Sequence, residues 1–206
     1  MSLESLLGSL KGRKPDILGH ENFMKFSVLL PLIEKNNEVH VLFEVRAQGL
    51  RRQPGEICFP GGRIDAGDRN EQECAVRETS EELGIPKSKI SNVVPLDYIV
   101  SAFGTVIYPF AGTIDEPDKI RPNVDEVGEI FTVPLDYFRK KAPDRYKINF
   151  QVHPEEGFPF DLIIGGENYN WQTRQMDEYF YRYGNKVIWG LTARVLSHFL
   201  ELTDRG

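Results

Sequence analysis

The sequence predicts an α/β fold in which helices cover a mixed central β-sheet. Two observations predict it: strand-like apolar runs recur from residue 25 to residue 164, and two well-separated helical segments, residues 71–84 and 187–202, interrupt and follow them. Strands that alternate with helices favour a sheet buried between helical layers. The 206 residues, with 40% hydrophobic and 27% charged side chains, suit one globular domain with a substantial core.

The N-terminal segment is expected to be a short amphipathic helix ahead of that domain. Residues 2–12 carry four leucines at helical spacing, Leu3, Leu6, Leu7 and Leu10. They would pack on the domain or on a partner, which leaves a homodimer open. Lys14-Pro15 then begins a linker, so residues 1–21 are predicted to be an extension and residues 22–206 a single domain.

The domain itself is predicted to begin with a β-hairpin. Residues 25–33 and 39–46 read as strands, and Asn36-Asn37 between them suits a tight turn. Further strands are predicted over shorter apolar runs at residues 56–59, 90–100, 105–114 and 130–133, with a loop at 117–122 and a helical turn at 134–138.

The later part of the chain is less regular. Residues 144–166 are expected to supply further strands, with a hairpin between residues 147–152 and 161–164. The aromatic-rich stretch 169–183 is expected to pack as core or lid, with a ligand pocket as the alternative.

The first long helix is expected to begin near Asn70 or Glu71 and to end at Gly84, a residue type suited to the left-handed conformation after a helix. Taken at about 100° per residue, one buried face collects Ala75, Val76, Thr79 and Leu83.

Three carboxylates, Glu78, Glu81 and Glu82, gather beside that face near the C-terminal end of the helix. Like charges at this spacing, at the negative end of the helix dipole, destabilise a helix unless a cation offsets them. Clustered carboxylate oxygens suit Mg²⁺ or Mn²⁺. A solvated acidic face is the plainer alternative, but the helix follows a Phe-Pro-Gly-Gly turn that would let backbone approach a ligand closely.

Composition argues against several classes of partner. The net charge of −6 and the isoelectric point near 5.3 speak against a broad nucleic-acid surface. No apolar run approaches the ~18–20 residues of a membrane span. Cys58 and Cys74 lack metal-type spacing and are expected to be reduced thiols. With no secretory signal and no peroxisomal signal in Asp204-Arg205-Gly206, the expected location is the cytoplasm.

The segment Arg77–Ile85, Arg-Glu-Thr-Ser-Glu-Glu-Leu-Gly-Ile, resembles the second half of the Nudix box, which would span residues 61–85. The first half departs from the common pattern, because Arg69 stands in the usual glutamate place and the loop is one residue longer. Asp65 or Asp68 could replace that glutamate. The longer loop is similar to the coenzyme A pyrophosphatase branch of the family.

Flanking segments are similar to the same branch. They are residues 42–46, Leu50-Arg51, Phe59-Pro60-Gly61-Gly62, 123–135 and 187–195. The resemblance therefore covers roughly residues 25–200, and it implies the Nudix α/β/α sandwich with its mixed central sheet.

The resemblance also implies a metal site and a substrate site. Glu78, Glu81 and Glu82, with the carbonyl of Gly61, would hold Mg²⁺ or Mn²⁺, and Arg77 would orient the glutamates. Glu78, Glu81 and Glu126 are the candidate catalytic residues, with Glu78 or Glu126 as the base that activates water. Candidate substrate-binding residues are Arg46, Arg51, Gly61 and Gly62, since arginine binds phosphate through two parallel donors.

The function that the resemblance implies is hydrolysis of coenzyme A or acyl-CoA, both small molecules, to 3′,5′-ADP and 4′-phosphopantetheine or its acylated form. One alternative is another nucleoside diphosphate derivative, such as ADP-ribose or NADH. A catalytically silent, nucleotide-binding Nudix domain is the alternative from a different class.

Overall fold

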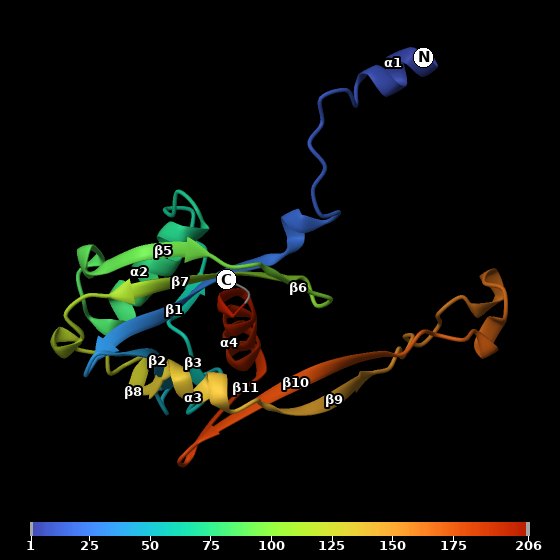
Figure 1. Cartoon of the computed structure of the whole chain (residues 1–206). Coiled ribbons are helices and arrows are strands. Elements are labelled where there is room, and N and C mark those ends of the chain that lie inside the picture. The colour runs from blue at the N-terminus through green and yellow to red at the C-terminus, as the bar shows by residue number, and fades with distance from the viewer. Residues whose placement is uncertain (1, 205–206) are drawn as a thin grey trace.

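The computed structural model describes residues 2–204. Outside the described residues lie Met1, Arg205 and Gly206, so the last two residues of the C-terminal tripeptide considered above are among them. Its main sheet has eight strands (Figure 1), and the central path runs in the order β3–β2–β1–β7–β5. β1 (Met24–Lys35) and β7 (Thr105–Ile114) are parallel, whereas β2 (Glu38–Arg46) and β5 (Ile90–Pro95) pair with them antiparallel. The predicted mixed central sheet is therefore confirmed.

Two further strands extend this sheet at its edges. β8 (Val127–Pro134) pairs with β2, and β6 (Ile99–Ser101) pairs with β7. The strand predicted over residues 90–100 is thus two strands, β5 and β6. Five 3₁₀ turns lie in the connections: η1 (His20–Asn22), η2 (Lys87–Lys89), η3 (Pro117–Lys119), η4 (Phe160–Leu162) and η5 (Gly166–Asn168).

The first hairpin opens into a wedge that holds the Phe-Pro-Gly-Gly segment. Its turn lies at Asn36-Asn37, as predicted, with positive φ at both residues. β1 and β2 pair near this turn and then diverge. β3 (Ile57–Cys58) pairs with β2 and β4 (Gly61–Arg63) pairs with β1, so they fill the gap between them. The chain was expected to leave the sheet after Phe59, but instead it returns to the sheet as β4.

Helix α2 (Glu71–Leu83) covers one face of the sheet. The Asn70 side chain caps it by accepting a hydrogen bond of 2.8 Å from the Glu73 amide, and Gly84 ends it in the left-handed region. Ala75, Thr79 and Leu83 are fully buried, as the helical spacing predicted.

The opposite face is covered by α3 (Leu135–Lys140) and α4 (Gly190–Thr203), which completes the predicted α/β/α sandwich. The helix predicted over residues 187–202 begins later than expected. Its first residues form β11 (Lys186–Trp189), because Val187 and Ile188 favour a strand and Gly190, with φ of 61°, turns the chain into the helix. In the first turn of α4, the Thr192 hydroxyl donates to the Ile57 carbonyl at 3.2 Å.

A second sheet, β9–β10–β11, projects from the body as a long arm (Figure 1). β9 (Asp144–Phe150) pairs with β10 (Arg174–Tyr183), so the hairpin predicted between residues 147–152 and 161–164 is wrong. Residues 160–162 form a 3₁₀ turn at the tip of the arm. The true partner is the aromatic-rich stretch, whose tyrosine and phenylalanine residues suit a strand better than the Gly-rich tip does.

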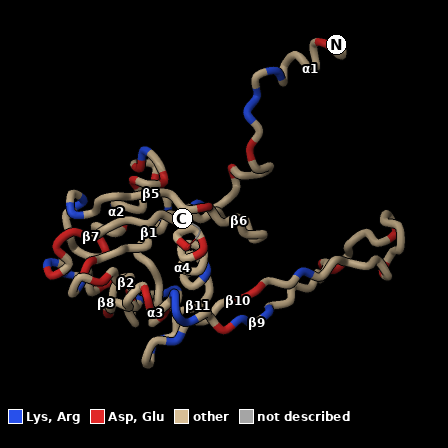
Figure 2. Tube along the Cα trace, viewed as in Figure 1, with Lys and Arg blue, Asp and Glu red and all other residues tan. Residues whose placement is uncertain are grey.

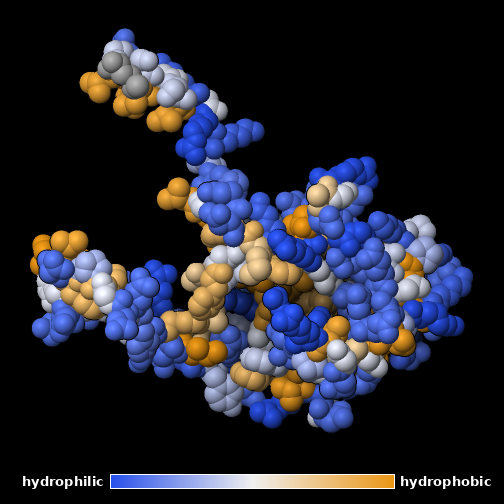
Figure 3. All heavy atoms as spheres, turned by 180° about the vertical axis from the view of Figure 1, so that it is seen from behind, coloured by the Kyte–Doolittle hydropathy of each residue, from blue (hydrophilic) through white to orange (hydrophobic). Residues whose placement is uncertain are grey.

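The N-terminal helix α1 (Leu3–Gly8) is present but has no buried residue. Its leucines, expected to pack on the domain or on a partner, lie away from the domain and form an exposed apolar face (Figure 3). Acidic and basic residues are interspersed over the body (Figure 2). Among residues 2–204, no helix has both the length and the apolar character needed to cross a membrane.

Candidate active site

Arg77 organises the acidic side chains of α2 and of the loop before it. Its Nε and Nη2 atoms donate to the two carboxylate oxygens of Asp68, at 2.8 and 2.9 Å. Its Nη1 atom donates to Glu78 at 2.8 Å and to Glu81 at 3.2 Å. A guanidinium that binds a carboxylate through two parallel bonds fixes the orientation of both groups. Arg77 therefore orients acidic residues, as predicted, and is itself fully engaged.

Of the two aspartates considered as replacements for the box glutamate, Asp68 pairs with Arg77 and Asp65 does not. Its side chain is only 2% exposed, and the Arg77 hydrogen bonds hold the pKa of that carboxyl well below its usual range. Asp65 instead shapes the loop, where its side chain accepts from the Gly67 amide and its own amide donates to Asp68.

Glu82 is a buried carboxylate directed at the Phe-Pro-Gly-Gly segment. It is 8% exposed and accepts a hydrogen bond of 2.8 Å from the Gly61 amide. Burial raises the pKa of Glu82 to about 8 despite that bond, and the negative charges of Glu78 and Glu126 add to the rise. The anionic form of Glu82 is therefore disfavoured in the protein alone, and a nearby cation would stabilise it.

Glu78 lies against the same segment, whereas Glu81 lies at the rim. A β-carbon on Gly62 would overlap the Glu78 carboxylate. Position 62 must therefore be glycine for the carboxylate to lie this close to the backbone. Burial raises the pKa of Glu78 although Arg77 opposes the shift. The Glu81 side chain is 56% exposed. Of the predicted residues, Gly61, Gly62, Glu78 and Glu82 are brought together.

The loop before β8 docks on the C-terminal end of α2. The Arg121 and Asn123 amides donate to the carbonyls of Leu83 and Glu82, at 3.0 and 2.9 Å. Glu126 is exposed at the end of this loop, and its charge raises the pKa of Glu82. This predicted catalytic residue therefore lies beside the carboxylates of α2.

The two predicted phosphate-binding arginines differ in their positions. Arg46 ends β2 and donates to the Arg52 carbonyl at 3.4 and 3.3 Å, and its positive charge counters the rise in the pKa of Glu82. Arg46 therefore lies at the acidic site. Arg51 is exposed in the following loop, and the structure does not bring it to these carboxylates.

The residues present fit a divalent cation. Within the part of the chain that the structure describes, no three potential ligands already converge on one point, so an ion would draw the carboxylates together. The strongest sign that it belongs here is Glu44, which is 1% exposed and whose Oε1 atom has no hydrogen-bond partner among the described residues. Sequence reasoning missed Glu44, although a charge inside the apolar run Val41–Val45 was a usable signal.

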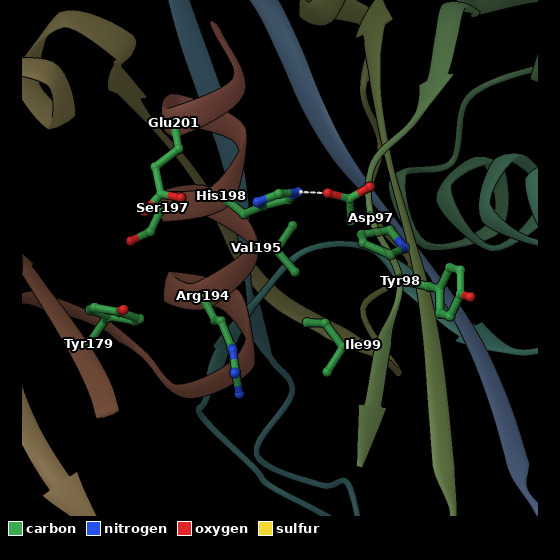
Figure 4. A pocket seen from close by; sticks show the side chains of 10 residues that line it. Asp97, Tyr98, Ile99, Tyr179, Arg194, Val195, Ser197, His198 and Glu201 are labelled. Carbon is green, nitrogen blue, oxygen red and sulfur yellow. Dashed lines mark ion pairs between the residues drawn. The ribbon is translucent and has the colours of Figure 1, made fainter. Parts of the chain in front are cut away.

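Two of the cavities outside this cluster differ in their position relative to Arg46. One, of about 250 Å³, lies on the α4 face of the sheet, where His198 points toward Asp97 at 3.0 Å (Figure 4). The other, of about 450 Å³, lies between the loop at Pro54–Ile57 and the β10–β11 pair, with Trp189 in its wall. The second cavity adjoins the loop that follows Arg46, and neither cavity is lined by a carboxylate of α2.

A carboxylate-bearing helix packed against a glycine-containing strand, inside an α/β/α sandwich, has counterparts among known proteins. The family described as NUDIX domain matches residues 25–152. The chain belongs to this family and is a Nudix hydrolase, an enzyme of a class that acts on small nucleotide diphosphates and generally uses divalent metal ions.

Several relatives are similar to this chain. A mouse protein named peroxisomal coenzyme A diphosphatase NUDT7 is 40% identical over 61% of this chain, a match that spans only 55% of the mouse protein. An uncharacterized Nudix hydrolase, NudL, of Pectobacterium atrosepticum is 31% identical over 87% of this chain and 83% of its own length. The crystal structure of a MutT/nudix family protein from Enterococcus faecalis shares the fold, with a TM-score of 0.53 and 14% identity over 99% of this chain and 70% of that one.

Proposed function

We propose that this Nudix hydrolase cleaves the diphosphate bond of coenzyme A or acyl-CoA, giving 3′,5′-ADP and 4′-phosphopantetheine or its acylated form. One observation carries the chemistry: Glu78 and Glu82 meet Gly61 and Gly62 of β4, and both carboxyl groups are disfavoured as anions there. Such a site is completed by a cation and, through it, by a phosphate.

The metal-binding residues would be Glu78, Glu82 and the Gly61 carbonyl, with Glu81 reaching in from the rim. Bound Mg²⁺ or Mn²⁺ would neutralise the negative charge on the diphosphate oxygens and lower the pKa of attacking water. Arg77 holds Glu78 in place, and Arg46 supplies a fixed positive charge for a substrate phosphate. Arg51 would reach the substrate from its exposed loop.

The base that accepts the proton of the attacking water is better assigned to Glu126 than to Glu78. One oxygen of Glu78 already accepts from Arg77, whereas Glu126 is exposed on a loop beside the site. A base needs a free oxygen within hydrogen-bond reach of the water, and within residues 2–204 no group donates a hydrogen bond to the Glu126 carboxylate.

The choice of coenzyme A is supported by the mouse coenzyme A diphosphatase relative and by a cavity at the loop that follows Arg46. The cavity of about 450 Å³ lies between the loop after Arg46 and Trp189. Coenzyme A carries a long, largely uncharged pantetheine arm beyond its diphosphate, and a cavity with an aromatic wall suits such an arm.

Product analysis tests this proposal. Purified protein would be incubated with coenzyme A, ADP-ribose or NADH, each with Mg²⁺, Mn²⁺ or chelator, and the products separated by chromatography. Metal-dependent release of 3′,5′-ADP, faster than turnover of the other two substrates, is expected. Turnover of ADP-ribose or NADH without coenzyme A would contradict the proposed substrate, and silence on all three would favour a nucleotide-binding role.

A cytoplasmic location, a homodimer, and the division into residues 1–21 and 22–206 stay predictions. The exposed leucines of α1 and the projecting β9–β10 arm offer surfaces for a second copy (Figure 3). Light scattering of the full chain at several concentrations measures its mass in solution.

A further inference from the structure

Glu44 is a buried acid that the proposed chemistry does not yet use. It lies two residues before the end of β2, between Phe43 and Val45, and is 1% exposed. Its Oε1 atom has no hydrogen-bond partner anywhere in residues 2–204. A buried carboxylate without partners is costly, so a position like this calls for a ligand or a proton.

The Glu44 side chain is directed at the acidic site. Successive residues of a strand point to opposite faces of the sheet. Phe43 packs in the core on the α3 and α4 side, whereas Leu42 packs in the core under α2. Glu44 therefore shares the face of Leu42, on which α2 carries Glu82.

Electrostatics agree with this placement. Burial raises the pKa of Glu44 well above its usual range, and the negative charge of Glu82 is the next largest cause. Glu126 acts in the same direction, whereas Arg46 opposes it. Glu44 and Glu82 therefore lie on the same side of the sheet, close enough for their charges to interact, and the charges of Glu126 and Arg46 reach Glu44 as well.

The protein groups around this space do not satisfy both acids. Gly61 donates one hydrogen bond to Glu82, and Arg46 donates to the Arg52 carbonyl. Cys58, the cross-strand neighbour of Glu44, stays a neutral thiol because burial raises its pKa to about 12. Two buried carboxylates that accept so few hydrogen bonds are best neutralised by a cation that takes oxygen ligands.

We infer that Glu44 is a further carboxylate of the divalent-cation site, approaching the ion from the sheet while Glu78 and Glu82 approach it from α2. The inference rests on the proposed metal-dependent function and adds a residue that lies outside the Nudix box. It also explains why a charged residue interrupts the otherwise apolar run Val41–Val45.

Binding of Mn²⁺ alone, without substrate, tests this role. The free ion would be followed by electron paramagnetic resonance during titration of the full chain, comparing wild type with Glu44→Gln. Glu38→Gln is the matched control, because Glu38 lies on the same strand with its side chain 69% exposed. Glu44→Gln is expected to weaken Mn²⁺ binding by about 10–100-fold, and Glu38→Gln to leave it unchanged.

Thermal unfolding in chelator supplies a second readout. Removing a buried acid relieves its repulsion with Glu82, so Glu44→Gln is expected to match or exceed wild type in metal-free stability while gaining less from Mn²⁺. A merely structural role would lower stability with and without the ion. Glu44→Asp keeps the negative charge but shortens the side chain by one methylene, so its Mn²⁺ affinity is expected to lie between those of wild type and Glu44→Gln. This variant tests the role of Glu44 even where Glu44→Gln does not fold.

Wild-type affinity and stoichiometry in Glu44→Gln, or in Glu44→Asp where Glu44→Gln does not fold, would overturn the inference. Glu82→Gln distinguishes a failure of the proposed metal site from a failure of the role assigned to Glu44. If Glu82→Gln loses Mn²⁺ while Glu44→Gln does not, the proposed function stands and Glu44 is removed from the site. If Glu82→Gln also binds Mn²⁺ as wild type does, the proposed metal site itself is contradicted.

Discussion

At the scale of single residues, the site combines acids that have partners with acids that lack them. Asp68 is matched by Arg77 and lies ionised in a nearly closed position. Glu82 has one amide donor and Glu44 has an unpaired oxygen. Asp68, which is paired, therefore fixes the loop, whereas Glu82 and Glu44 are the acids that a cation would neutralise.

The buried acids predict an unusual pH dependence for the metal-free protein. The pKa of Glu82 is about 8 in the folded chain against an ordinary value of 4.5. A carboxyl group whose pKa is raised by folding binds more protons when folded, so stability falls as pH rises between these two values. Glu44 acts in the same direction. Melting temperatures in chelator should therefore decline from pH 4.5 to 8.

Glu82→Gln is the comparison for that decline, since an amide does not titrate. The variant should show a weaker fall in melting temperature over the same pH range. Added Mn²⁺ should reduce the decline in wild type. A wild-type melting temperature that rises steadily across this range would contradict the assignment of a buried, cation-free acid.

The arginines make a second prediction at this scale. Arg46 lies at the acidic site, and a hydrogen bond to a charged group contributes about 1.5–3 kcal/mol, so Arg46→Ala should raise KM for coenzyme A by roughly 10–100-fold. Steady-state kinetics would measure it. Arg52→Ala is the control, because Arg52 contributes a backbone carbonyl that the substitution keeps. Unchanged KM and kcat in Arg51→Ala would remove Arg51 from the substrate site.

At the scale of elements, the junction between α2 and the loop before β8 brings Glu126 to the site. Gly84 has φ of 61°, and a β-carbon there would overlap the Arg121 carbonyl. A strained backbone position of this kind costs about 1–3 kcal/mol, so Gly84→Ala should lower the free energy of unfolding by that amount and reduce activity by displacing the loop.

Chemical denaturation measures the effect, and Gly67→Ala provides the control. Gly67 lies in the loop before α2, and a β-carbon there would meet no atom within 4 Å. It should change stability by no more than about 0.5 kcal/mol. Equal effects of the two substitutions would show that the junction is not tightly fitted.

The same scale shows what could be predicted from the sequence. The limits of α2 followed from local signals, because Asn70 and Gly84 cap its ends. The pairing of β9 with β10 did not, since 23 residues, 151–173, separate the strands and no turn motif fixes their register. β4 was missed because its two glycines suggested a loop, whereas the divergence of β1 and β2 creates a place for them in the sheet.

The candidate site was predictable to a similar extent. The carboxylates of α2 are local in sequence, so their helical spacing placed them together. Glu44 comes from a distant strand, and its approach to Glu82 depends on which face of the sheet α2 covers. Strand alternation alone does not show which face α2 covers. The packing of Leu42 and Ala75 in one core determines it.

At the scale of the whole molecule, the body and its two projections have different roles. The sheet and its helices contain the site, while α1 and the β9–β10 arm extend away from it (Figure 1). Residues 2–16 are exposed throughout. A chain lacking residues 1–21 should therefore keep the melting temperature and the kcat/KM of the full chain.

That deletion also tests the homodimer. If the leucines of α1 join two copies, the shortened chain should elute at half the mass in light-scattering chromatography. A large loss of thermal stability in the shortened chain would contradict the division into an extension and a domain.

The most direct test of the account is the rate of coenzyme A hydrolysis as a function of Mn²⁺ concentration, in wild type, Glu82→Gln and Glu73→Gln. Glu73 lies on the same helix but pairs with Arg69, away from the site. Wild type and Glu73→Gln should show no turnover in chelator and a saturable rise with the ion, while Glu82→Gln should stay at least about 100-fold slower. Equal rates in Glu82→Gln and wild type would contradict a cation held by the carboxylates of α2.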